Sequence, residues 1–407
     1  MHCGLLGRKL GHSYSPQIHE FLGDYPYPLY EKEPEDLSQF FRTATFTGLN
    51  VTIPYKKDVI PYCAELTDKA QKLGAVNTIV RGKDGRLIGH NTDYFGFLSM
   101  VNKSGLAVSG KKVLVLGSGG ASVTVVAVLQ ELGAQVVVIS RSGADNYNNL
   151  HLHADARVIV NTTPVGMYPN TGSSPVDLAQ FPALEGVLDL IYNPARTKLI
   201  IDAEDLGLVT QNGLWMLVAQ AKESAEWFTG RPIPNERIEH IYNRLQRQME
   251  NIVLIGMPGS GKSTVGKLLA QMTGREFVDS DASIEKEAGM SIPQIFATMG
   301  EDGFRKLETA VLSDLGKRSG LVIATGGGCV TRPENYPLLH QNGRIIWLQR
   351  TLADLPRDGR PLSQSTEMET MYRIRKPLYE AFSDYITDNN CQPEITVTNI
   401  LKAEDLL

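Results

Sequence analysis

Short apolar runs alternate with stretches of helical spacing along nearly the whole chain. In the first part, residues 49–53 predict a strand, residues 75–81 and 86–89 predict a hairpin, and residues 92–103 predict a helix. This alternation is typical of an α/β protein with mostly parallel sheets.

The second part has four predicted strands before a long helix at residues 214–228. These strands lie at residues 112–116, 135–140, 157–161 and 187–190. The chain between Arg141 and Asn161 is short for a strand–helix–strand crossover, and residues 146–149 are poor helix formers. We therefore expect one crossover helix to be lost or reduced here.

A helix that begins at Glu236, with Asn235 as its N-cap, leads almost directly into the third part. The strands of this part are predicted at residues 252–255, 276–278, 321–324, 344–348 and 394–398. The pattern predicts three domains, which lie at residues 1–104 with 214–248 returning to them, 105–213, and 251–407.

The composition is that of a globular enzyme, with 407 residues of which 42% are hydrophobic and 21% charged. A net charge of -5 does not favour a nucleic-acid partner. The four cysteines are scattered without the spacing of a zinc site or a disulfide framework, which fits a reducing cytoplasm. The first seven residues lack the features of a secretory signal, and no apolar stretch predicts a membrane span.

Residues 256–263 read Gly-Met-Pro-Gly-Ser-Gly-Lys-Ser, the pattern of a nucleoside-triphosphate loop between a strand and a helix. Its glycines allow backbone N–H groups to surround phosphate oxygens, Lys262 supplies a positive charge, and the Ser263 hydroxyl can ligate magnesium. The residues predicted to bind the nucleotide here are Gly256, Gly259, Ser260, Gly261, Lys262, Ser263 and Thr264.

Two acidic residues follow the strand at residues 276–278, whereas no Asp follows the strand at residues 321–324. Asp279 and Asp281 are therefore candidates, with Ser263, to hold magnesium or to accept a proton from an attacking hydroxyl. Alternatively, the acidic pair only caps a helix.

Five more motifs stand in the third part of the chain. They are Asp-Ser-Asp at 279–281, Phe-Arg-Lys-Leu-Glu at 304–308, Gly-Gly-Gly at 326–328, Gly-Arg-Pro-Leu at 359–362 and Arg-Lys-Pro-Leu-Tyr-Glu at 375–380. With these motifs and the phosphate loop, residues 252–401 resemble shikimate kinase.

This resemblance implies a role for each matching residue. Asp281 faces the acceptor hydroxyl, and Arg360 reaches the transferring phosphate together with Lys262. The substrate is held by Arg305, Gly327 and Arg375. Arg357 is the candidate for stacking on adenine. Guanidinium groups suit an anionic, polyhydroxylated acid because they bind a carboxylate in a fork.

A second glycine-rich turn follows the strand at residues 112–116, with Ser122 at the third glycine position. The next strand ends at Arg141 rather than at an acidic residue, which favours the additional phosphate of NADP over NAD; alternatively, Arg141 is a surface residue without a ligand. The residues predicted to bind NADP are Gly117, Ser118, Gly119, Gly120, Ala121, Ser140, Arg141, Ser142 and, at the start of a later helix, Gly213.

Seven motifs appear in order in the first 245 residues. They stand at residues 11–16, 50–56, 74–78, 91–93, 161–167, 189–194 and 212–217. Together they make residues 1–245 similar to shikimate dehydrogenase, which implies that Lys56 and Asp93 are the catalytic pair for hydride reduction of a ring ketone. Which of the two moves the proton stays open, because a coupled pair shares its titration.

The same resemblance assigns the substrate contacts. Ser13 and Ser15 bind the substrate carboxylate, and its ring hydroxyls or carboxylate are contacted by Thr52, Asn77, Tyr192 and Gln220. Ordinary structural roles compete with these assignments, since Ser13 and Ser15 are also suited to cap the following helix and Asn77 to form a turn.

The two resemblances imply a bifunctional oxidoreductase and transferase of aromatic amino acid biosynthesis. A substrate domain and a Rossmann domain would reduce 3-dehydroshikimate to shikimate with NADPH, and a P-loop kinase domain with a short parallel sheet would make shikimate 3-phosphate from ATP and Mg²⁺. Two alternatives stay open at this stage. The first part could prefer quinate with NAD, or the chain could be a nucleotide-sensing regulator without catalysis.

Overall fold

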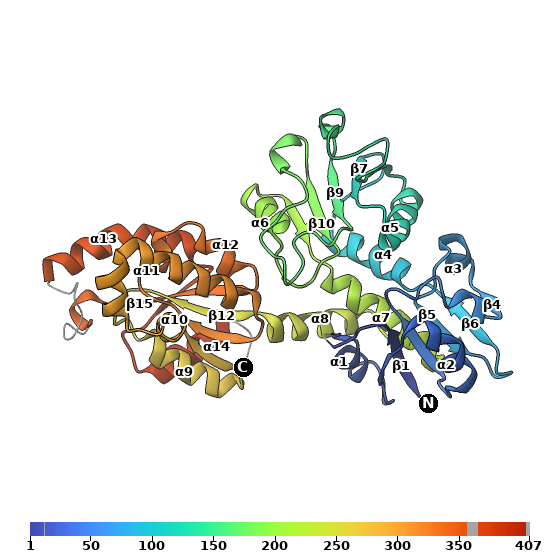
Figure 1. The fold of residues 1–407 in the computed structure, drawn as a ribbon, viewed down its shortest axis with the longest axis horizontal. Helices are drawn as coiled ribbons and strands as arrows, with labels where there is room; N and C mark the ends of the chain where they lie inside the picture. Colours follow the sequence, from blue (N-terminus) through green and yellow to red (C-terminus); the bar gives the residue numbers. More distant parts are fainter. Residues whose placement is uncertain (12, 356–364, 404–407) are drawn as a thin grey trace. The chain divides into compact units, whose positions relative to one another are not determined.

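The computed structural model describes residues 1–11, 13–355 and 365–403, and the strands in these ranges form three sheets (Figure 1). The first sheet has the strand order β2-β1-β3-β5-β6-β4. Its strands are β1 (Cys3–Gly7), β2 (Leu29–Glu31), β3 (Gly48–Val51), β4 (Glu65–Leu66), β5 (Thr78–Arg81) and β6 (Leu87–His90). The antiparallel pairing of β5 with β6 confirms the predicted hairpin.

Helices from distant parts of the sequence accompany this first sheet. They are α1 (Ser15–Glu20), α2 (Leu37–Thr43), α3 (Asp68–Leu73), α4 (Asp93–Ser104) and α7 (Leu214–Thr229). α7 packs along α4 and against β3 and β5, so the chain after residue 213 returns to the first sheet. Leu6, Leu49 and Ile79 belong to a core with Leu37 and Phe40 of α2, and none of the three is exposed.

The second sheet is parallel throughout and has the order β11-β10-β9-β7-β8. Its strands are β7 (Lys112–Leu116), β8 (Gln135–Ile139), β9 (Val158–Asn161), β10 (Gly186–Asp189) and β11 (Val209–Gln211), with helices α5 (Gly120–Glu131) and α6 (Lys198–Asp205). Only the short 3₁₀ helix Leu150–His153 lies between β8 and β9, which confirms the reduced crossover. The strand order reverses between β7 and β9, where doubly wound folds bind ligands.

The third sheet is also parallel and has the order β13-β14-β12-β15-β16. Its strands are β12 (Asn251–Ile255), β13 (Glu276–Asp279), β14 (Leu321–Ala324), β15 (Gly343–Gln349) and β16 (Tyr385–Asp388). Its helices are α9 (Lys262–Thr273), α10 (Ser280–Ala288), α11 (Ile292–Lys317), α12 (Asn335–His340), α13 (Ser365–Phe382) and α14 (Pro393–Ala403). Helix α8 (Glu236–Met249) precedes β12.

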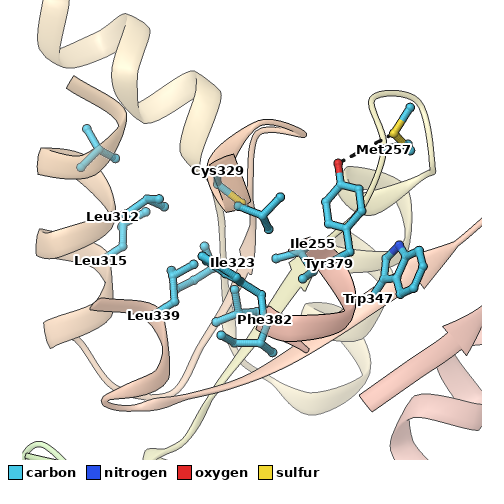
Figure 2. Packing of buried hydrophobic residues seen from close by; sticks show 14 of the residues in the cluster. Ile255, Met257, Leu312, Leu315, Ile323, Cys329, Leu339, Trp347, Tyr379 and Phe382 are labelled. Atoms are coloured by element: carbon cyan, nitrogen blue, oxygen red, sulfur yellow. Dashed lines mark hydrogen bonds between the residues drawn. The ribbon is translucent and has the colours of Figure 1, made fainter. Parts of the chain in front are cut away.

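Apolar side chains fill both faces of this third sheet. Ile252 and Leu254 belong to a core with residues of α9 and α14, whereas Val253 and Ile255 belong to the core beneath α11 and α13. Alternate strand residues point to opposite faces, so a strand buried on both faces reads as a continuous apolar run. Figure 2 shows the second core, where Ile255 lies among side chains from α11, α12 and α13.

The predicted strand at residues 394–398 is wrong, because these residues lie in helix α14. Its isoleucine, valine and threonines favour a strand locally. However, Pro393 occupies the start of the helix, and Val397, Ile400 and Leu401 are buried at helical spacing against α9. Tertiary burial therefore outweighs local propensity, and the fifth strand is β16, which precedes this segment.

Contacts divide the chain into two compact units. The first contains Met1–Val165, Ser174–Tyr192 and Asp202–Leu245, and therefore the first two sheets. The second contains Gly166–Ser173, Asn193–Ile201 and Gln246–Leu407, and therefore the third sheet. Within the described ranges, no helix combines the length and the apolar character that a bilayer span requires.

We predict that Gly316→Ala destabilises the second unit. An added Cβ at Gly316 on α11 would lie 1.8 Å from the backbone oxygen of Leu338 on α12, so the helices would have to separate. The free energy of unfolding should fall by about 1–3 kcal/mol, as in other overpacked cores, in a denaturant titration. Asp314→Ala, at an exposed site on the same helix, is the control and should change little. Equal stability of the two variants would contradict this packing.

Candidate active sites

Lys56 and Asp93 form an ion pair in the first unit. Lys56 lies beyond the end of β3, Asp93 is the first residue of α4, and their Nζ and Oδ2 atoms are 2.6 Å apart. The Lys56 side chain is 31% exposed and that of Asp93 is 15% exposed. An ammonium and a carboxylate in direct contact, with solvent access on one side, can exchange a proton with a bound substrate.

Asn77 and Gln220 meet beside this pair. The Asn77 Oδ1 atom accepts a hydrogen bond of 2.7 Å from the backbone N–H of Thr92, the residue before Asp93. Its Nδ2 atom lies 3.0 Å from Thr92 Oγ1 and 3.5 Å from Gln220 Oε1. Asn77, directly before β5, and Gln220, on α7, therefore both lie beside Thr92, the residue that precedes Asp93.

Three buried residues that we did not predict, Asn50, Thr78 and Ser224, form a hydrogen-bond network next to Asn77. Asn50 Nδ2 donates to Thr78 Oγ1 at 3.0 Å and to Ser224 Oγ at 2.8 Å. The Ser224 hydroxyl also lies 2.8 Å from Thr78 Oγ1 and 2.9 Å from Thr92 Oγ1. Asn50 and Thr78 stand inside the motifs of the sequence analysis, and Ser224 follows Gln220 by one helical turn, which was the available signal.

Ser13 and Ser15 lie at the start of α1. The Ser13 Oγ atom accepts a hydrogen bond of 3.2 Å from the backbone N–H of Ser15, whereas the N-cap of α1 is Tyr14, which makes no side-chain cap bond. Tyr14 between them contacts Tyr192 edge to face, with ring centroids 6.1 Å apart. Burial raises the pKa of Tyr192, which keeps its hydroxyl protonated.

Thr52 directly follows β3, and its N–H is bonded to Leu6 of β1. Thr52 lies four residues before Lys56 in the chain. Tyr192 contacts Tyr14, the residue between Ser13 and Ser15.

The glycine turn after β7 is shaped as the sequence predicts. Gly117 has a φ of +101°, and an added Cβ there would lie 2.9 Å from Thr162 Oγ1. At Gly119 and Gly120 an added Cβ would meet no atom within 4 Å, so space is open at the N-terminus of α5. Ser122 is buried and donates to the Gly119 carbonyl at 2.6 Å, which explains a serine at the third glycine position. Ser118 and Ala121, the other predicted turn residues, are exposed.

Arg141 is exposed just beyond β8, between Ser140 and Ser142. β8 lies beside β7, and the Gly117 N–H donates to Ile139 O at 2.8 Å, so Arg141 stands next to the glycine turn. Gly213 has a different reason to be glycine, because an added Cβ would lie 2.0 Å from Leu190 O. Its part in cofactor binding remains a prediction.

The phosphate loop in the second unit curls around its own lysine. Gly256, Gly259 and Gly261 have φ values of +144°, +82° and +94°, which favour glycine. The Lys262 ammonium is buried and donates to the carbonyls of Gly256 and Met257 at 2.9 Å each. Ser260 is buried in the loop, and Ser263 and Thr264 are exposed at the start of α9.

Asp279 caps helix α10 and also contacts Ser263 at the start of α9. Its Oδ1 atom accepts from the N–H of Asp281 at 3.0 Å and caps α10, while its Oδ2 atom accepts from Ser263 Oγ at 2.8 Å. Burial, and then the nearby Asp279 charge, raise the pKa of Asp281. Among the described residues, Asp281 Oδ1 is buried without a hydrogen-bond partner. The three predicted magnesium ligands are therefore neighbours.

The triple glycine lets charged groups approach one another. An added Cβ at Gly326 would lie 2.7 Å from Asp281 Oδ1 and 2.9 Å from Glu308 Oε1. Arg305 donates to the fully buried Glu308 carboxylate at 2.7 Å. Burial raises the pKa of Glu308, although Arg305 opposes this rise. Glu308 is a site residue that we did not predict, although it stands in the 304–308 motif.

Arg375 reaches the same loop from α13, where its Nη1 atom donates to Gly327 O at 3.1 Å. The Tyr379 hydroxyl donates to the same oxygen at 2.5 Å and lies 3.9 Å from Met257 Sδ of the phosphate loop (Figure 2). Gly327 and the phosphate loop are therefore linked through one buried tyrosine. The predicted roles of Arg357 and Arg360 lie outside the described residues.

Two family models match the chain. A model described as shikimate dehydrogenase substrate binding domain matches residues 5–79, and one described as shikimate kinase matches residues 258–404. The first match covers three of the seven dehydrogenase motifs, and the second covers the five kinase motifs between residues 279 and 380.

Relatives cover the N-terminal part almost from end to end. A shikimate dehydrogenase (NADP(+)) of Clostridium perfringens is 35% identical over 265 residues, which are 60% of this chain and 97% of the relative. One of Thermosynechococcus vestitus is 38% identical over 260 residues, 57% of this chain and 91% of the relative. The shikimate 5-dehydrogenase structure from Thermus thermophilus, in complex with NADP(H) and shikimate, has a TM-score of 0.54 and 31% identity, covering 60% of this chain and 99% of that one. The chain therefore belongs to the shikimate dehydrogenase family in its N-terminal part and carries a shikimate kinase domain in its C-terminal part.

Proposed function

We propose that the chain catalyses two consecutive steps of aromatic biosynthesis. The first unit reduces 3-dehydroshikimate to shikimate with NADPH, and the second transfers the γ-phosphoryl group of ATP to shikimate. The observation that carries this proposal is that one chain holds two charged sites within the matching family motifs. One is the Lys56–Asp93 pair, and the other is formed by Asp281 with the Arg305–Glu308 pair. Both sites accept the same small hydroxylated acid.

In the first unit, NADPH supplies a hydride for the ring carbonyl carbon. The carbonyl oxygen then becomes an alkoxide and takes a proton from the Lys56–Asp93 pair, which leaves shikimate as the product. Asn77, Gln220 and the other predicted polar residues orient the ring by hydrogen bonds to its hydroxyls. Arg141 balances the additional phosphate of NADP, because a guanidinium suits a phosphate and no acidic residue stands at the end of β8.

In the second unit, the shikimate hydroxyl loses its proton to Asp281 as its oxygen attacks the γ-phosphorus. The bond from that phosphorus to the bridging oxygen breaks, and ADP leaves with the electron pair. Lys262 lies in the loop that would hold the phosphates, and Arg305 and Arg375 balance the substrate carboxylate. Ser263 Oγ and the Asp279 and Asp281 carboxylates are the hard oxygen ligands that Mg²⁺ prefers, and the contact of 2.8 Å between Ser263 and Asp279 supports this site. Arg360 and Arg357, which the resemblance assigns to the phosphate and to adenine, lie outside the described residues.

The proposed compartment is the cytoplasm. All four cysteines, Cys3, Cys63, Cys329 and Cys391, are free thiols, as a reducing environment would keep them. The proposed partners are the small-molecule substrates named above.

We predict that Lys56→Ala removes reduction but not phosphorylation. Loss of the proton donor should lower kcat for 3-dehydroshikimate about 10²- to 10⁴-fold, measured as NADPH absorbance. Lys57→Ala, at the exposed neighbouring position, should keep wild-type rates. The kinase rate of the same Lys56 variant serves as an internal control for folding. A Lys56 variant that still reduces the ketone at the wild-type rate would contradict the role of Lys56, and a wild-type chain that does not reduce it would favour the sensing regulator.

We predict that Asp281→Asn lowers kinase activity and raises thermal stability. Because burial raises the folded-state pKa above the unfolded value, the stabilisation from this carboxyl is complete below the unfolded pKa and is lost as the pH rises through the folded pKa. At pH 7 the ionised Asp281 therefore lowers stability, so the neutral asparagine should raise Tm while kcat falls by about 10²-fold or more.

Calorimetric unfolding at pH 7 and a coupled ADP assay measure the two effects of Asp281→Asn. Asp314→Asn, at an exposed site on α11, is the control and should change neither quantity. A lower Tm together with a normal kinase rate would refute the assignment of Asp281.

We predict that Arg141→Ala weakens the preference for NADPH. Loss of a charged hydrogen bond to the ribose phosphate should raise KM for NADPH about 10- to 100-fold and leave KM for NADH nearly unchanged. Steady-state rates with both cofactors, and with quinate as well as shikimate in the reverse direction, measure this preference. Equal KM changes for both cofactors would show that Arg141 does not read the phosphate.

A further inference from the structure

Asn389 is a buried residue whose side-chain amide forms a hydrogen bond with the phosphate loop. It follows strand β16, is 6% exposed, and donates from Nδ2 to the Ser260 carbonyl at 2.6 Å. Its Oδ1 atom accepts from Thr396 Oγ1 of α14 at 2.7 Å, and its backbone N–H donates to Gln349 O at 2.8 Å. Both ends of the side chain are therefore bonded, and the amide has a fixed orientation.

The contact with Ser260 fixes the direction of the next N–H group. In a trans peptide the carbonyl and the N–H point in opposite directions. When the Ser260 carbonyl is held toward Asn389, the Gly261 N–H points away from Asn389. That N–H belongs to the last loop residue before α9, where backbone donors and the helix dipole favour phosphate oxygens.

The loop also approaches Asn389 unusually closely. Gly261 has a φ of +94°, and an added Cβ would lie 2.7 Å from Asn389 Nδ2. A side chain at residue 261 would displace the amide, so the glycine and the asparagine are fitted to one another.

We propose that Asn389 is a positioning residue for the nucleotide, acting through the peptide between Ser260 and Gly261. This inference rests on the proposed kinase function, since it concerns the affinity of the same loop for the phosphates of ATP and ADP. Asn389 acts through the loop and need not touch the nucleotide. Thr396 holds Asn389 in turn, so α14 contributes to the position of the phosphate loop.

A second buried asparagine offers a matched control. Asn251 is fully buried at the start of β12, the opposite end of this strand from the loop. Its Nδ2 atom donates to Arg318 O at 2.8 Å, and its Oδ1 atom accepts from Leu321 N–H at 2.8 Å. Asn251→Ala thus removes the same two kinds of bond without touching the phosphate loop.

The test is the affinity of the full chain for Mg²⁺–ADP, measured by titration calorimetry. Loss of one oriented hydrogen bond should raise Kd about 5- to 10-fold in Asn389→Ala. Asn251→Ala should lower Tm but leave Kd within about twofold of wild type. The KM for shikimate and the rate of NADPH oxidation should stay at wild-type values in both variants.

The isosteric variant Thr396→Val covers the case in which Asn389→Ala does not fold. It removes the donor to Asn389 Oδ1 and, with it, the longer contacts of the same hydroxyl with Asp388 O and Cys391 Sγ, both at 3.4 Å. The Kd for ADP should therefore rise about 2- to 5-fold. A Kd unchanged in Thr396→Val and in any folded Asn389→Ala, or raised equally by Asn251→Ala, would overturn the positioning role. A wild-type chain that does not bind ADP would overturn the proposed kinase function, and this inference with it.

Discussion

Both sites hold acidic and basic side chains in direct contact, and this pairing of charges constrains the sequence around them. A charge removed from water is unstable unless a partner and hydrogen bonds replace the solvent. Asp93 has Lys56 as this partner, and Glu308 has Arg305. Small residues must then stand where the charges converge, as Gly326 does between Asp281 and Glu308.

The two sites meet this constraint in different ways. In the first unit, the ion pair is partly exposed, and a buried network of hydroxyl and amide groups orients the polar residues next to it. In the second unit, the charges are more deeply buried, and the phosphate loop, the triple glycine and Tyr379 form one connected set. Phosphoryl transfer benefits from a site that excludes water, which fits the deeper burial of the second site.

The sequence predicts most of the fold because its strands are buried apolar runs with turn residues between them. The strand at 112–116 and the helix that begins at Glu236 lie where the pattern places them. The strand predicted at 394–398 failed because β-branched residues favour a strand locally, while burial against α9 decides for a helix. Glu308, Ser224 and Asn389 could not be assigned roles from the sequence alone, since each acts through contacts with distant residues.

The most direct test of this account is to supply the full chain with 3-dehydroshikimate, NADPH, ATP and Mg²⁺. NADPH consumption is followed by absorbance, and the products are identified by mass spectrometry. The account predicts NADPH oxidation together with a phosphorylated shikimate, and no phosphorylated product when NADPH is omitted. A folded chain that neither oxidises NADPH nor transfers phosphate would contradict it.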